Sequence, residues 1–428
     1  MSMNTKDFYI NNFGISASSC DLGEKAMEMS RDAFMQAEKT AEFNQMKVLK
    51  AFMNNNISEQ HFMTTTGYGY DDLGRDTLDK VYAEVFGAEA ALVRQTIVNG
   101  THAIASCLFG VLRPGDTLVA VTGRPYDTLE EVIGIRGENN GSLKEFGVKY
   151  KEVPLKDNKP DYEGIRAAID DSVKAVAIQR SRGYAWRESF SVDEIGKIIK
   201  CVKDIRSDII CIVDNCYGEF VEEREPTQVG ADLIVGSLIK NPGGGLAKTG
   251  GYIAGTKKCI EQVSYRVTCP GIGAECGATL GENRYMYQGF FMAPHIVCQA
   301  VKAAIYCGCI FSLMGFDIMP GVDEKRTDII QAVKFENKEN LVAFCQGIQS
   351  GSPIDSFVVP MPWDMPGYEN EVIMAAGAFV QGSSIEISAD GPIREPFVSY
   401  YQGGLTFESA KVAILKAADK VIGERNDG

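Results

Sequence analysis

Apolar side chains recur at intervals near three, four and seven through the first sixty residues of the chain. This spacing places them on one face of a helix and predicts an N-terminal helical arm over residues 1–63, with one or two helices. From Thr64 the composition changes to glycine, tyrosine and aspartate, which predicts a loop. Asp76 can cap the helix that follows this loop and runs towards Phe86. The apolar positions of the arm are Met27, Phe34, Met35, Phe43, Met46, Leu49 and Phe52.

Short β-branched runs alternate with helical segments over residues 64–320, which we expect to form one large domain. Such an alternation is typical of a mostly parallel sheet that helices cover on both faces, so the predicted fold class is α/β. A long helix over about residues 283–314 should lie just before the domain boundary. The predicted strands cover residues 117–121, 175–178, 209–213 and 233–235, and the predicted helices cover residues 101–112, 162–169 and 192–202.

Residues 321–428 should form a smaller α+β domain at the C-terminus. The pattern predicts a helix over about residues 337–349 and a final helix over residues 407–422. Strands are expected at residues 372–376 and 384–387. The chain contains no repeat of fixed period and no low-complexity tract.

The composition narrows the classes of partner. The 428 residues are 45% hydrophobic and 23% charged, as in ordinary globular domains, which excludes a disordered chain. With 43 basic and 57 acidic residues the formal charge is −14, whereas nucleic acids and anionic membranes favour a positive partner. Residues 297–314 are the most membrane-like stretch, but Gln299 and Lys302 within it favour a packed core helix. We therefore expect no nucleic acid and no membrane as partners, and a small molecule as ligand.

The cysteines and histidines argue against disulfides and metals. Twelve cysteines are scattered from Cys20 to Cys345, and the N-terminus lacks a basic region followed by an apolar one. We interpret the cysteines as reduced thiols and expect a cytoplasmic protein. The chain has three histidines and no Cys-x-x-Cys pair, so we expect no bound metal.

Candidate chemistry gathers just after the apolar runs, where open parallel sheets bind their ligands. Two of these runs lead to Asp214 and, 26 residues later, to Lys240. Another run leads to Tyr126, and Gly100 and Thr101 begin a helix. Pyridoxal 5'-phosphate needs this set, because it takes a lysine amine for a Schiff base, a carboxylate for its ring nitrogen and a helix N-terminus for its phosphate. Each residue alone also fits a simpler role, as a turn cap, a solvated loop lysine, a packed ring or a helix start.

Two competing motifs are incomplete. Residues 243–249 (GGGLAKT) are similar to a P-loop, but Ala247 stands where that motif requires glycine directly before the lysine. No Gly-x-Ser-x-Gly segment marks a serine hydrolase. We therefore expect neither a nucleotide-binding loop nor a serine nucleophile.

Two segments resemble motifs of a known family. Val213 to Tyr217 (VDNCY) resembles V-D-N-T-F/Y, and Ser237 to Lys240 (SLIK) resembles S-x-T-K. Both motifs belong to the fold-type-I pyridoxal-phosphate enzymes of cysteine and methionine metabolism, which include cystathionine lyases and methionine gamma-lyase. The resemblance is greatest to their bacterial aluminium-resistance branch. It implies an aspartate aminotransferase-like fold, in which Asp214 binds the pyridine nitrogen, Ser237 contacts the phosphate and Lys240 carries the cofactor.

Further roles follow from the same resemblance. Gly100 and Thr101 would hold the phosphate with their amides, and Tyr126 would stack on the cofactor ring. Arg394, in the C-terminal domain, would grip the substrate carboxylate as a bidentate fork.

The Y-x-R motif, by which the lyases reach the phosphate of a neighbouring subunit, is altered. Tyr70 offers the cofactor-binding tyrosine, but Asp72 stands where arginine is expected, so either Arg75 substitutes or the register differs. Arg180 and Arg182 follow a predicted strand and could bind phosphate, the substrate carboxylate or a partner subunit, or be surface charges. We take Arg182 as a candidate for substrate binding.

The resemblance implies a carbon–sulfur lyase that acts on a sulfur-containing amino acid by β- or γ-elimination through a Schiff base on Lys240. The freed lysine, its pKa lowered by desolvation and nearby cations, would take the Cα proton, and Tyr126 or Lys240 would protonate the departing sulfur. An aminotransferase of the same fold and a pyridoxal-phosphate-binding protein without turnover stay open as alternatives. The family also implies a homodimer or homotetramer with active sites at the interface.

Overall fold

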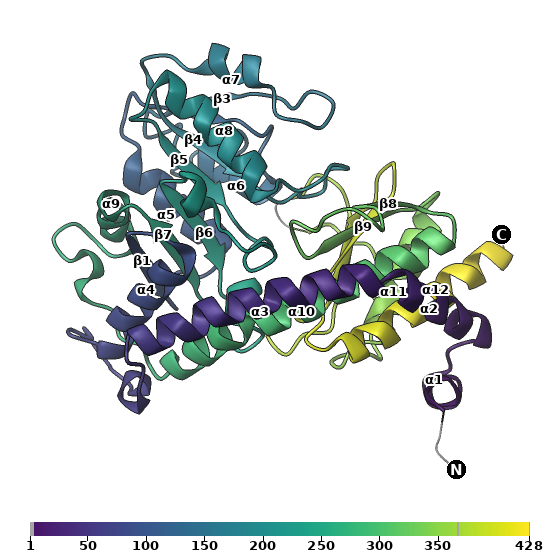
Figure 1. The fold of residues 1–428 in the computed structure, drawn as a ribbon. Coiled ribbons are helices and arrows are strands. Elements are labelled where there is room, and N and C mark those ends of the chain that lie inside the picture. Colours follow the sequence, from purple (N-terminus) through teal and green to yellow (C-terminus); the bar gives the residue numbers. More distant parts are fainter. Residues whose placement is uncertain (1–3, 366–367, 428) are drawn as a thin grey trace. The chain divides into compact units, whose positions relative to one another are not determined.

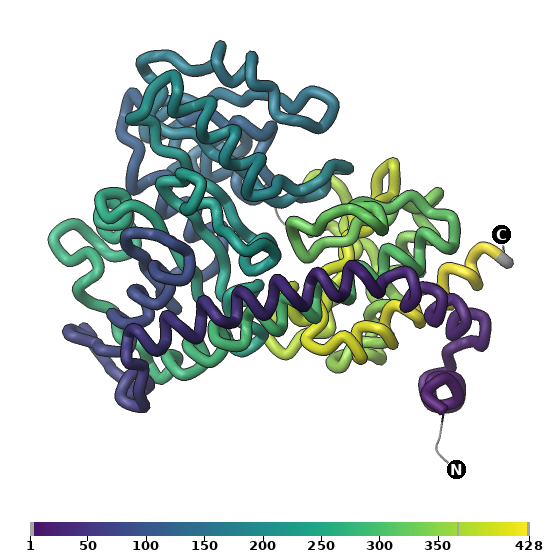
Figure 2. The backbone as a smooth tube through the Cα atoms, viewed as in Figure 1, coloured from purple at the N-terminus to yellow at the C-terminus, as the bar shows by residue number. Residues whose placement is uncertain are grey.

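The structure is a computed structural model that describes residues 4–365 and 368–427 (Figures 1 and 2). The chain forms two compact units. The expected domain limits at residues 63/64 and 320/321 stay a prediction. The smaller unit comprises Met1–Glu42, Tyr184–Glu188 and Pro294–Gly428, and the larger unit comprises Phe43–Gly183 and Ser189–Ala293.

Over its described residues, 4–63, the N-terminal arm is helical, but it contains three α-helices instead of one or two: α1 (Thr5–Phe13), α2 (Ala17–Met29) and α3 (Arg31–Asn54), followed by a short 3-10 helix (Glu59–Phe62). Gly14 ends α1 in the left-handed conformation, with φ 67°, and the Ser16 side chain caps the N-terminus of α2. The apolar spacing continues across these short breaks, so periodicity alone does not reveal them.

The larger unit is built on a seven-stranded sheet in the order β1-β7-β6-β5-β4-β2-β3. The strands β6, β5, β4, β2 and β3 pair in parallel, whereas β7 is antiparallel to both β6 and β1. The predicted mostly parallel sheet is therefore confirmed. The strands are β1 (Ala90–Arg94), β2 (Thr117–Ala120), β3 (Lys149–Glu152), β4 (Val173–Gln179), β5 (Ile210–Asp214), β6 (Leu233–Ser237) and β7 (Gly251–Gly255).

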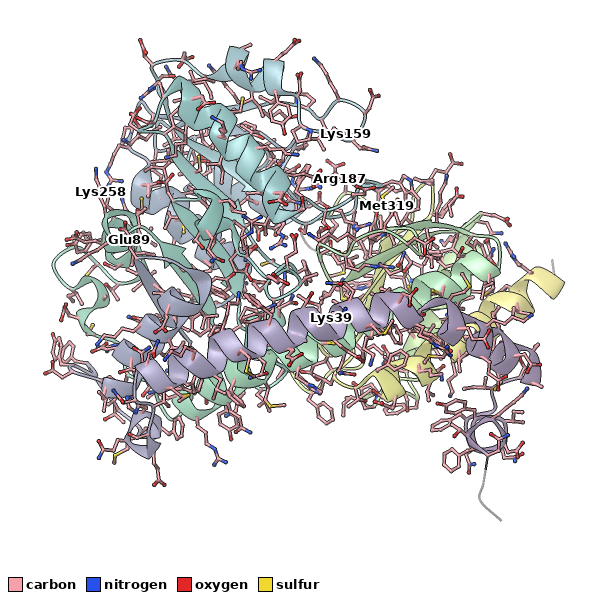
Figure 3. The ribbon with its side chains drawn as sticks, in the orientation of Figure 1. Lys39, Glu89, Lys159, Arg187, Lys258 and Met319 are labelled. Atoms are coloured by element: carbon pink, nitrogen blue, oxygen red, sulfur yellow. The ribbon has the colours of Figure 1, made fainter. Side chains whose placement is uncertain are left out.

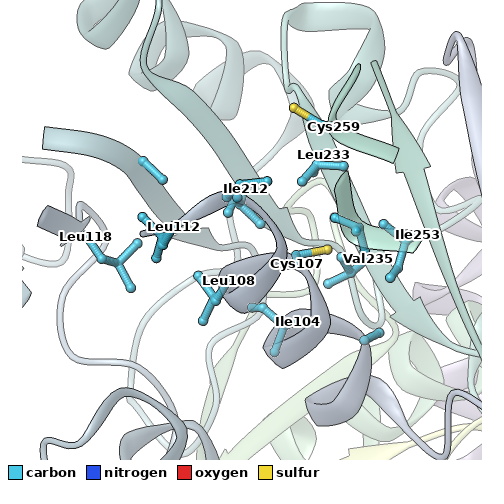
Figure 4. Packing of buried hydrophobic residues seen from close by; sticks show 14 of the residues in the cluster. Ile104, Cys107, Leu108, Leu112, Leu118, Ile212, Leu233, Val235, Ile253 and Cys259 are labelled. Carbon is cyan, nitrogen blue, oxygen red and sulfur yellow. The ribbon is translucent and has the colours of Figure 1, made fainter. Parts of the chain in front are cut away.

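Helices cover both faces of this sheet, as neighbouring residues of β7 show, because adjacent side chains of a strand point to opposite faces. Ile253 lies in one buried cluster with Ile104 and Leu108 of α5 (Figure 4). The ring of Tyr252 packs instead beside Tyr82 of α4, with centroids 5.8 Å apart. The helices of this unit are α4 (Leu73–Phe86), α5 (Gly100–Val111), α6 (Asp127–Ile133), α7 (Tyr162–Ala168), α8 (Val192–Ile205) and α9 (Lys257–Val267).

The cap of α4 differs from the sequence prediction. Asp72, and not Asp76, is the capping residue, and its carboxylate accepts a hydrogen bond from the backbone N–H of Arg75 at 2.7 Å. Asp76 lies inside the first turn and pairs with Arg75 Nε at 2.9 Å. Both positions suit an acid at a helix start, so the sequence did not distinguish them.

The smaller unit contains an antiparallel sheet in the order β10-β11-β12-β9-β8. The strand predicted at residues 372–376 is confirmed as β10, but the one predicted at residues 384–387 is wrong, because these residues form a turn before β11. There the Glu386 carboxylate accepts hydrogen bonds from the backbone N–H groups of Phe379 and Val380 at 2.6 and 3.0 Å, which stabilises the turn. The elements of this unit are β8 (Asp317–Met319), β9 (Ile330–Lys334), β10 (Val372–Ala376), β11 (Ser388–Pro392), β12 (Val398–Gln402), α11 (Lys338–Ser350) and α12 (Phe407–Asp427).

The predicted long helix is α10 (Asn283–Leu313), which belongs partly to each unit. Among the described residues it is the one helix long and apolar enough to cross a membrane, but 72% of its most apolar window is buried inside the protein. Lys302 on α10 pairs with Glu38 of α3 at 2.9 Å. Both features are those of a packed core helix.

The twelve cysteines are free thiols in the described part of the chain, and most of them are buried. Over the same residues, no group of three or more histidine, cysteine, aspartate or glutamate side chains is arranged to hold a metal ion. The cytoplasmic location stays a prediction.

Candidate active site

The candidate residues follow strands whose carboxyl ends meet at one edge of the large sheet (Figure 1). β5 ends at Asp214, and its neighbour β6 ends at Ser237, three residues before Lys240. β2 leads towards Tyr126, and β4 leads directly into Arg180. Because these strands are parallel neighbours, the residues that follow them start from the same edge.

Asp214 holds a buried carboxylate at this edge. Its Oδ1 accepts a hydrogen bond from the backbone N–H of Cys216 at 3.1 Å, and its carbonyl accepts one from the backbone N–H of Arg180 at 3.1 Å. The carboxylate also acts on Tyr126, whose phenolic pKa is raised first by burial and then by Asp214. Asp214 and Tyr126 therefore share one electrostatic environment.

The Lys240 amine lies against the ring of Tyr217, with Nζ 3.9 Å from the ring centroid. Burial lowers the pKa of this amine, but Cys216, Tyr217 and Asp214 outweigh burial and hold the pKa well above its ordinary value. Desolvation lowers this pKa as expected, but the expected net lowering is wrong, because the groups that act on the amine besides burial raise its pKa and none of them is a cation. The same coupling brings the two central candidates, Lys240 and Asp214, into one environment.

The N-terminus of α5 packs against the residues at the carboxyl ends of β5 and β6, and we call this part of the sheet edge the corner. A Cβ atom added to Gly100 would lie 3.2 Å from Cys216 Sγ and 3.7 Å from Ser237 Cβ, so the helix start touches the residues that follow β5 and end β6. The Ser237 hydroxyl is buried and has no hydrogen-bond partner among the described residues. Because the first amides of a helix also lack partners within it, this corner has the donors that an anion such as a phosphate requires.

Tyr126 and Thr101 lie together at this corner. The Tyr126 hydroxyl donates a hydrogen bond to Thr101 Oγ1 at 3.2 Å. The backbone N–H of Tyr126 donates to Gln179 Oε1 at 3.1 Å, which ties the start of α6 to the end of β4. The tyrosine ring is therefore held beside the first turn of α5, next to Gly100.

Arg180 and Arg182 are not surface charges. They are 0% and 1% exposed, whereas Lys159 and Lys258 of the same unit are exposed, and Figure 3 labels both at the rim of this unit. This burial excludes one of the alternatives that the sequence left open.

The Arg180 guanidinium is engaged within the interior. Nη1 donates to Asn215 Oδ1 at 2.8 Å and Nη2 donates to Glu222 Oε1 at 3.0 Å. Nε donates to the carbonyl of Phe190 at 3.3 Å, and Glu225 Oε2 lies 3.8 Å from Nη1. Arg180 therefore fastens the loop after β5 to the end of β4. Ligand binding by Arg182 stays a prediction.

The contacts of the loop that carries Tyr70 are made to residues of its own chain. The Tyr70 ring is 58% exposed and stacks on Tyr68, with centroids 5.4 Å apart. Arg75 is buried, and its Nη1 donates to the carbonyl oxygens of Gly69 and Gly277 at 2.5 and 3.0 Å. These contacts disfavour the idea that Arg75 supplies the arginine missing from the Y-x-R motif.

Arg394 belongs to the smaller unit, where it is exposed in the turn between β11 and β12. Its role as a carboxylate ligand stays a prediction. Sequence reasoning gave no role to Cys216 or Tyr217, although both lie in the VDNCY segment. Tyr217 adopts a φ of 74°, which is unusual for a residue with a large side chain and which no sequence pattern reveals.

The chain has the fold of the fold-type-I pyridoxal-phosphate-dependent enzymes. A pyridoxal-5'-phosphate-dependent protein of Escherichia coli, YhfS, shares this fold with a TM-score of 0.60 at 14% identity, over 91% of this chain and 97% of that protein. The predicted fold class is thereby confirmed.

The chain belongs to the methionine gamma-lyase family, whose model matches residues 19–422. It is 56% identical over 406 residues to the uncharacterized protein YnbB of Bacillus subtilis strain 168, which covers 94% of this chain and 96% of that protein. It is also similar to the crystal structure of a carbon–sulfur lyase involved in aluminium resistance from Clostridium novyi NT. That structure has a TM-score of 0.93 and 56% identity, over 97% of this chain and 99% of the other. The family and its neighbours indicate pyridoxal 5'-phosphate as the cofactor.

Proposed function

We propose that this protein is a pyridoxal-phosphate-dependent carbon–sulfur lyase that acts on a sulfur-containing amino acid by β- or γ-elimination. The observation that carries the proposal is the corner where Lys240 and Asp214 act on each other while the start of α5 packs against Ser237. An amine, an acid and an anion-binding helix start are the three groups that this cofactor requires. The relative from Clostridium novyi, named as a carbon–sulfur lyase, supports the choice of reaction.

The residues of the corner fit the cofactor. Lys240 would bond its aldehyde carbon, and Asp214 would pair with its ring nitrogen. The amides of Gly100 and Thr101, together with the partnerless hydroxyl of Ser237, would bind the phosphate. When bound, the cofactor supplies an electron sink for the carbanion at the substrate Cα.

Proton transfer falls to Lys240 and Tyr126. The amine of Lys240 would take the Cα proton, and the acids that raise its pKa make it hold that proton firmly. Burial raises the pKa of Tyr126, so its hydroxyl stays protonated at neutral pH and can donate to the departing sulfur. Arg394 and Arg182 are our candidates for binding the substrate carboxylate, as a guanidinium fork.

A second copy of the chain is the proposed partner, as a homodimer or homotetramer. Tyr68 and Tyr70 offer a stacked, exposed aromatic pair on the loop that, in the related lyases, reaches the neighbouring site. Aromatic residues exposed in this way are typical of protein interfaces. The size of the oligomer can be measured by light scattering.

Replacement of Lys240 tests the proposal most directly. The purified wild type should show a visible absorption band and release thiol, keto acid and ammonia from one of a panel of sulfur amino acids. Lys240→Ala should abolish the covalent attachment of the cofactor and all turnover. Lys248→Ala is the matched control, because Lys248 is 51% exposed and pairs with Glu282.

The products separate the proposal from its rivals. Keto acid and ammonia should appear without any added amino acceptor, whereas an aminotransferase would require one. A Lys240→Ala variant with full activity, or a wild type that binds the cofactor but turns over no sulfur amino acid, would contradict the proposed function.

A further inference from the structure

A second buried acid, Glu219, lies in the loop between β5 and β6, five residues after Asp214. The side chain is 0% exposed. Its Oε1 accepts a hydrogen bond from the Tyr252 hydroxyl at 2.9 Å, while Oε2 is buried without a hydrogen-bond partner among the described residues. A half-satisfied buried carboxyl costs free energy, so its presence calls for a physical reason.

Glu219 is linked to the residues that follow both central candidates of the site, directly to Asn241 and through Tyr252 to Asn215. The backbone carbonyl of Glu219 accepts a hydrogen bond from Asn241 Nδ2 at 3.0 Å, and Asn241 directly follows Lys240. On the other side, the Tyr252 hydroxyl that Glu219 binds also accepts from Asn215 Nδ2 at 3.4 Å. Asn215 directly follows Asp214. Glu219 is therefore linked to the neighbours of both Asp214 and Lys240.

We propose that Glu219 is a positioning residue, which holds the Asp214 loop and the Lys240 loop in register through Tyr252, Asn215 and Asn241. This inference rests on the proposed function, because it concerns the alignment of the two groups that would bracket the cofactor. Glu219 itself touches neither the cofactor nor the substrate in this assignment.

The strand that ends at Ser237 is shaped around this carboxyl. A Cβ atom on Gly236 would lie 2.4 Å from Glu219 Oε1 and 2.4 Å from Tyr252 Cε1. No side chain larger than hydrogen fits there without displacing the pair. The bond between Glu219 and Tyr252 is therefore packed directly against β6.

The pKa of Glu219 depends on burial and on nearby groups, one of which is the Lys240 amine. Burial, and next the Glu225 carboxylate, raise the pKa of Glu219 to about 8, while the Tyr252 hydroxyl and the Lys240 amine oppose this rise. The other titratable groups coupled to Glu219 are Tyr82 on α4 and Cys216 in its own loop.

The carboxyl is accordingly neutral at pH 7 and becomes an anion in mildly alkaline solution. An anion at this position would favour a positive charge on the nitrogen of Lys240. The ionisation of Glu219, which helps to position the two loops, therefore also affects the charge on the nitrogen of Lys240.

The experiment compares Glu219→Gln, Tyr252→Phe and Glu223→Gln in the cofactor-loaded protein. Glutamine keeps the size and the neutral hydrogen bond of the protonated carboxyl but cannot ionise, and phenylalanine removes only the hydroxyl that joins Glu219 to Asn215. Glu223 lies in the same loop but is exposed, so Glu223→Gln makes the same substitution away from the network. The readouts are the cofactor dissociation constant and the pH titration of the visible band.

Glu219→Gln should bind the cofactor within about twofold of the wild type, because the hydrogen bonds are retained. Its band should titrate about half a pH unit or more below the wild type, because no anion forms beside Lys240. Tyr252→Phe should weaken cofactor binding about threefold to tenfold, and Glu223→Gln should change neither readout.

Wild-type cofactor affinity in Tyr252→Phe would overturn the positioning role. A Glu219→Gln titration equal to that of the wild type would overturn the link between the ionisation of Glu219 and the charge on Lys240. In both cases the wild type would still bind the cofactor, so the proposed function would survive. A wild-type protein without a visible band or a reducible bond to Lys240 would instead overturn the proposed function and the positioning role with it.

Discussion

Two neighbouring parts of the same sheet edge treat buried polar groups in opposite ways. At the end of β4, Arg180 is 0% exposed and binds Asn215, Glu222 and a backbone carbonyl. At the end of β6, Ser237 is just as buried, but its hydroxyl has no hydrogen-bond partner among the described residues, and the start of α5 at Gly100 packs beside it. Buried groups with partners hold a fold together, whereas groups kept without them are available to a ligand.

The largest expected effect concerns Asp214, at the end of β5. Asp214→Asn should lower kcat about a thousandfold, or ~4 kcal/mol, because an amide cannot keep the cofactor ring nitrogen charged. The measurement is steady-state turnover at a cofactor occupancy checked by the visible band. A fully occupied variant with wild-type kcat would show that Asp214 serves only the fold.

Replacement of Arg180 tests the part of the edge at the end of β4, where the buried polar groups have partners. Arg180→Met should lower the free energy of unfolding by about 3–5 kcal/mol, because Glu222 and Glu225 would keep buried charges without their cation. Urea unfolding of the cofactor-free protein measures this loss. Lys258→Met, at an exposed position, should stay within about 0.5 kcal/mol of the wild type. A loss below about 1 kcal/mol in Arg180→Met would remove the contrast.

Glu219 predicts a pH dependence of stability. Its pKa is raised from 4.5 to about 8 in the folded chain, so between these values the folded state binds more protons than the unfolded state. The contribution of Glu219 to stability therefore falls as pH rises through this window. Relative to Glu219→Gln, the wild type should lose about 1 kcal/mol per pH unit between about pH 5.5 and 7.5, as chemical unfolding at each pH can measure. Parallel curves for the two proteins would contradict the shift.

The smallest effect is expected at Ser237. Ser237→Ala should weaken cofactor binding about tenfold through the lost phosphate contact, yet leave stability unchanged or slightly raised, since the hydroxyl has no partner to lose. Ser191→Ala is the converse control, because Ser191 caps α8 and its loss should cost about 1 kcal/mol of stability without changing cofactor affinity. A destabilised Ser237→Ala with wild-type affinity would reverse the comparison.

The sequence predicted the large sheet well because parallel strands are buried on both faces and read as plain apolar runs, such as the one that becomes β5. It failed where local signals compete. Residues 384–387 have the composition of a strand, but they form a turn. The Glu386 carboxylate stabilises this turn by accepting hydrogen bonds from the backbone N–H groups of Phe379 and Val380. Asp72 and Asp76 both suit the start of α4, and only the chain path selects Asp72.

The candidate site shows the same division. Motifs and spacing singled out Asp214, Ser237 and Lys240, and the structure brings them to one corner with the start of α5. The sequence could not show that Arg180 is engaged by buried acids, because those acids lie 42 and 45 residues further along the chain. Nor could it show that Cys216, Tyr217 and Asp214 raise the pKa of Lys240 against the effect of burial.

By itself, the sequence determined which residue types follow which strands, because alternation and motif spacing are local properties of the chain. Only the tertiary structure decided which of those polar groups find partners, since burial and the electrostatic environment depend on residues that folding brings together from distant segments. Glu219 is the clearest case: an ordinary acid in the sequence, it becomes a neutral, buried link once Tyr252 and Asn241 close around it.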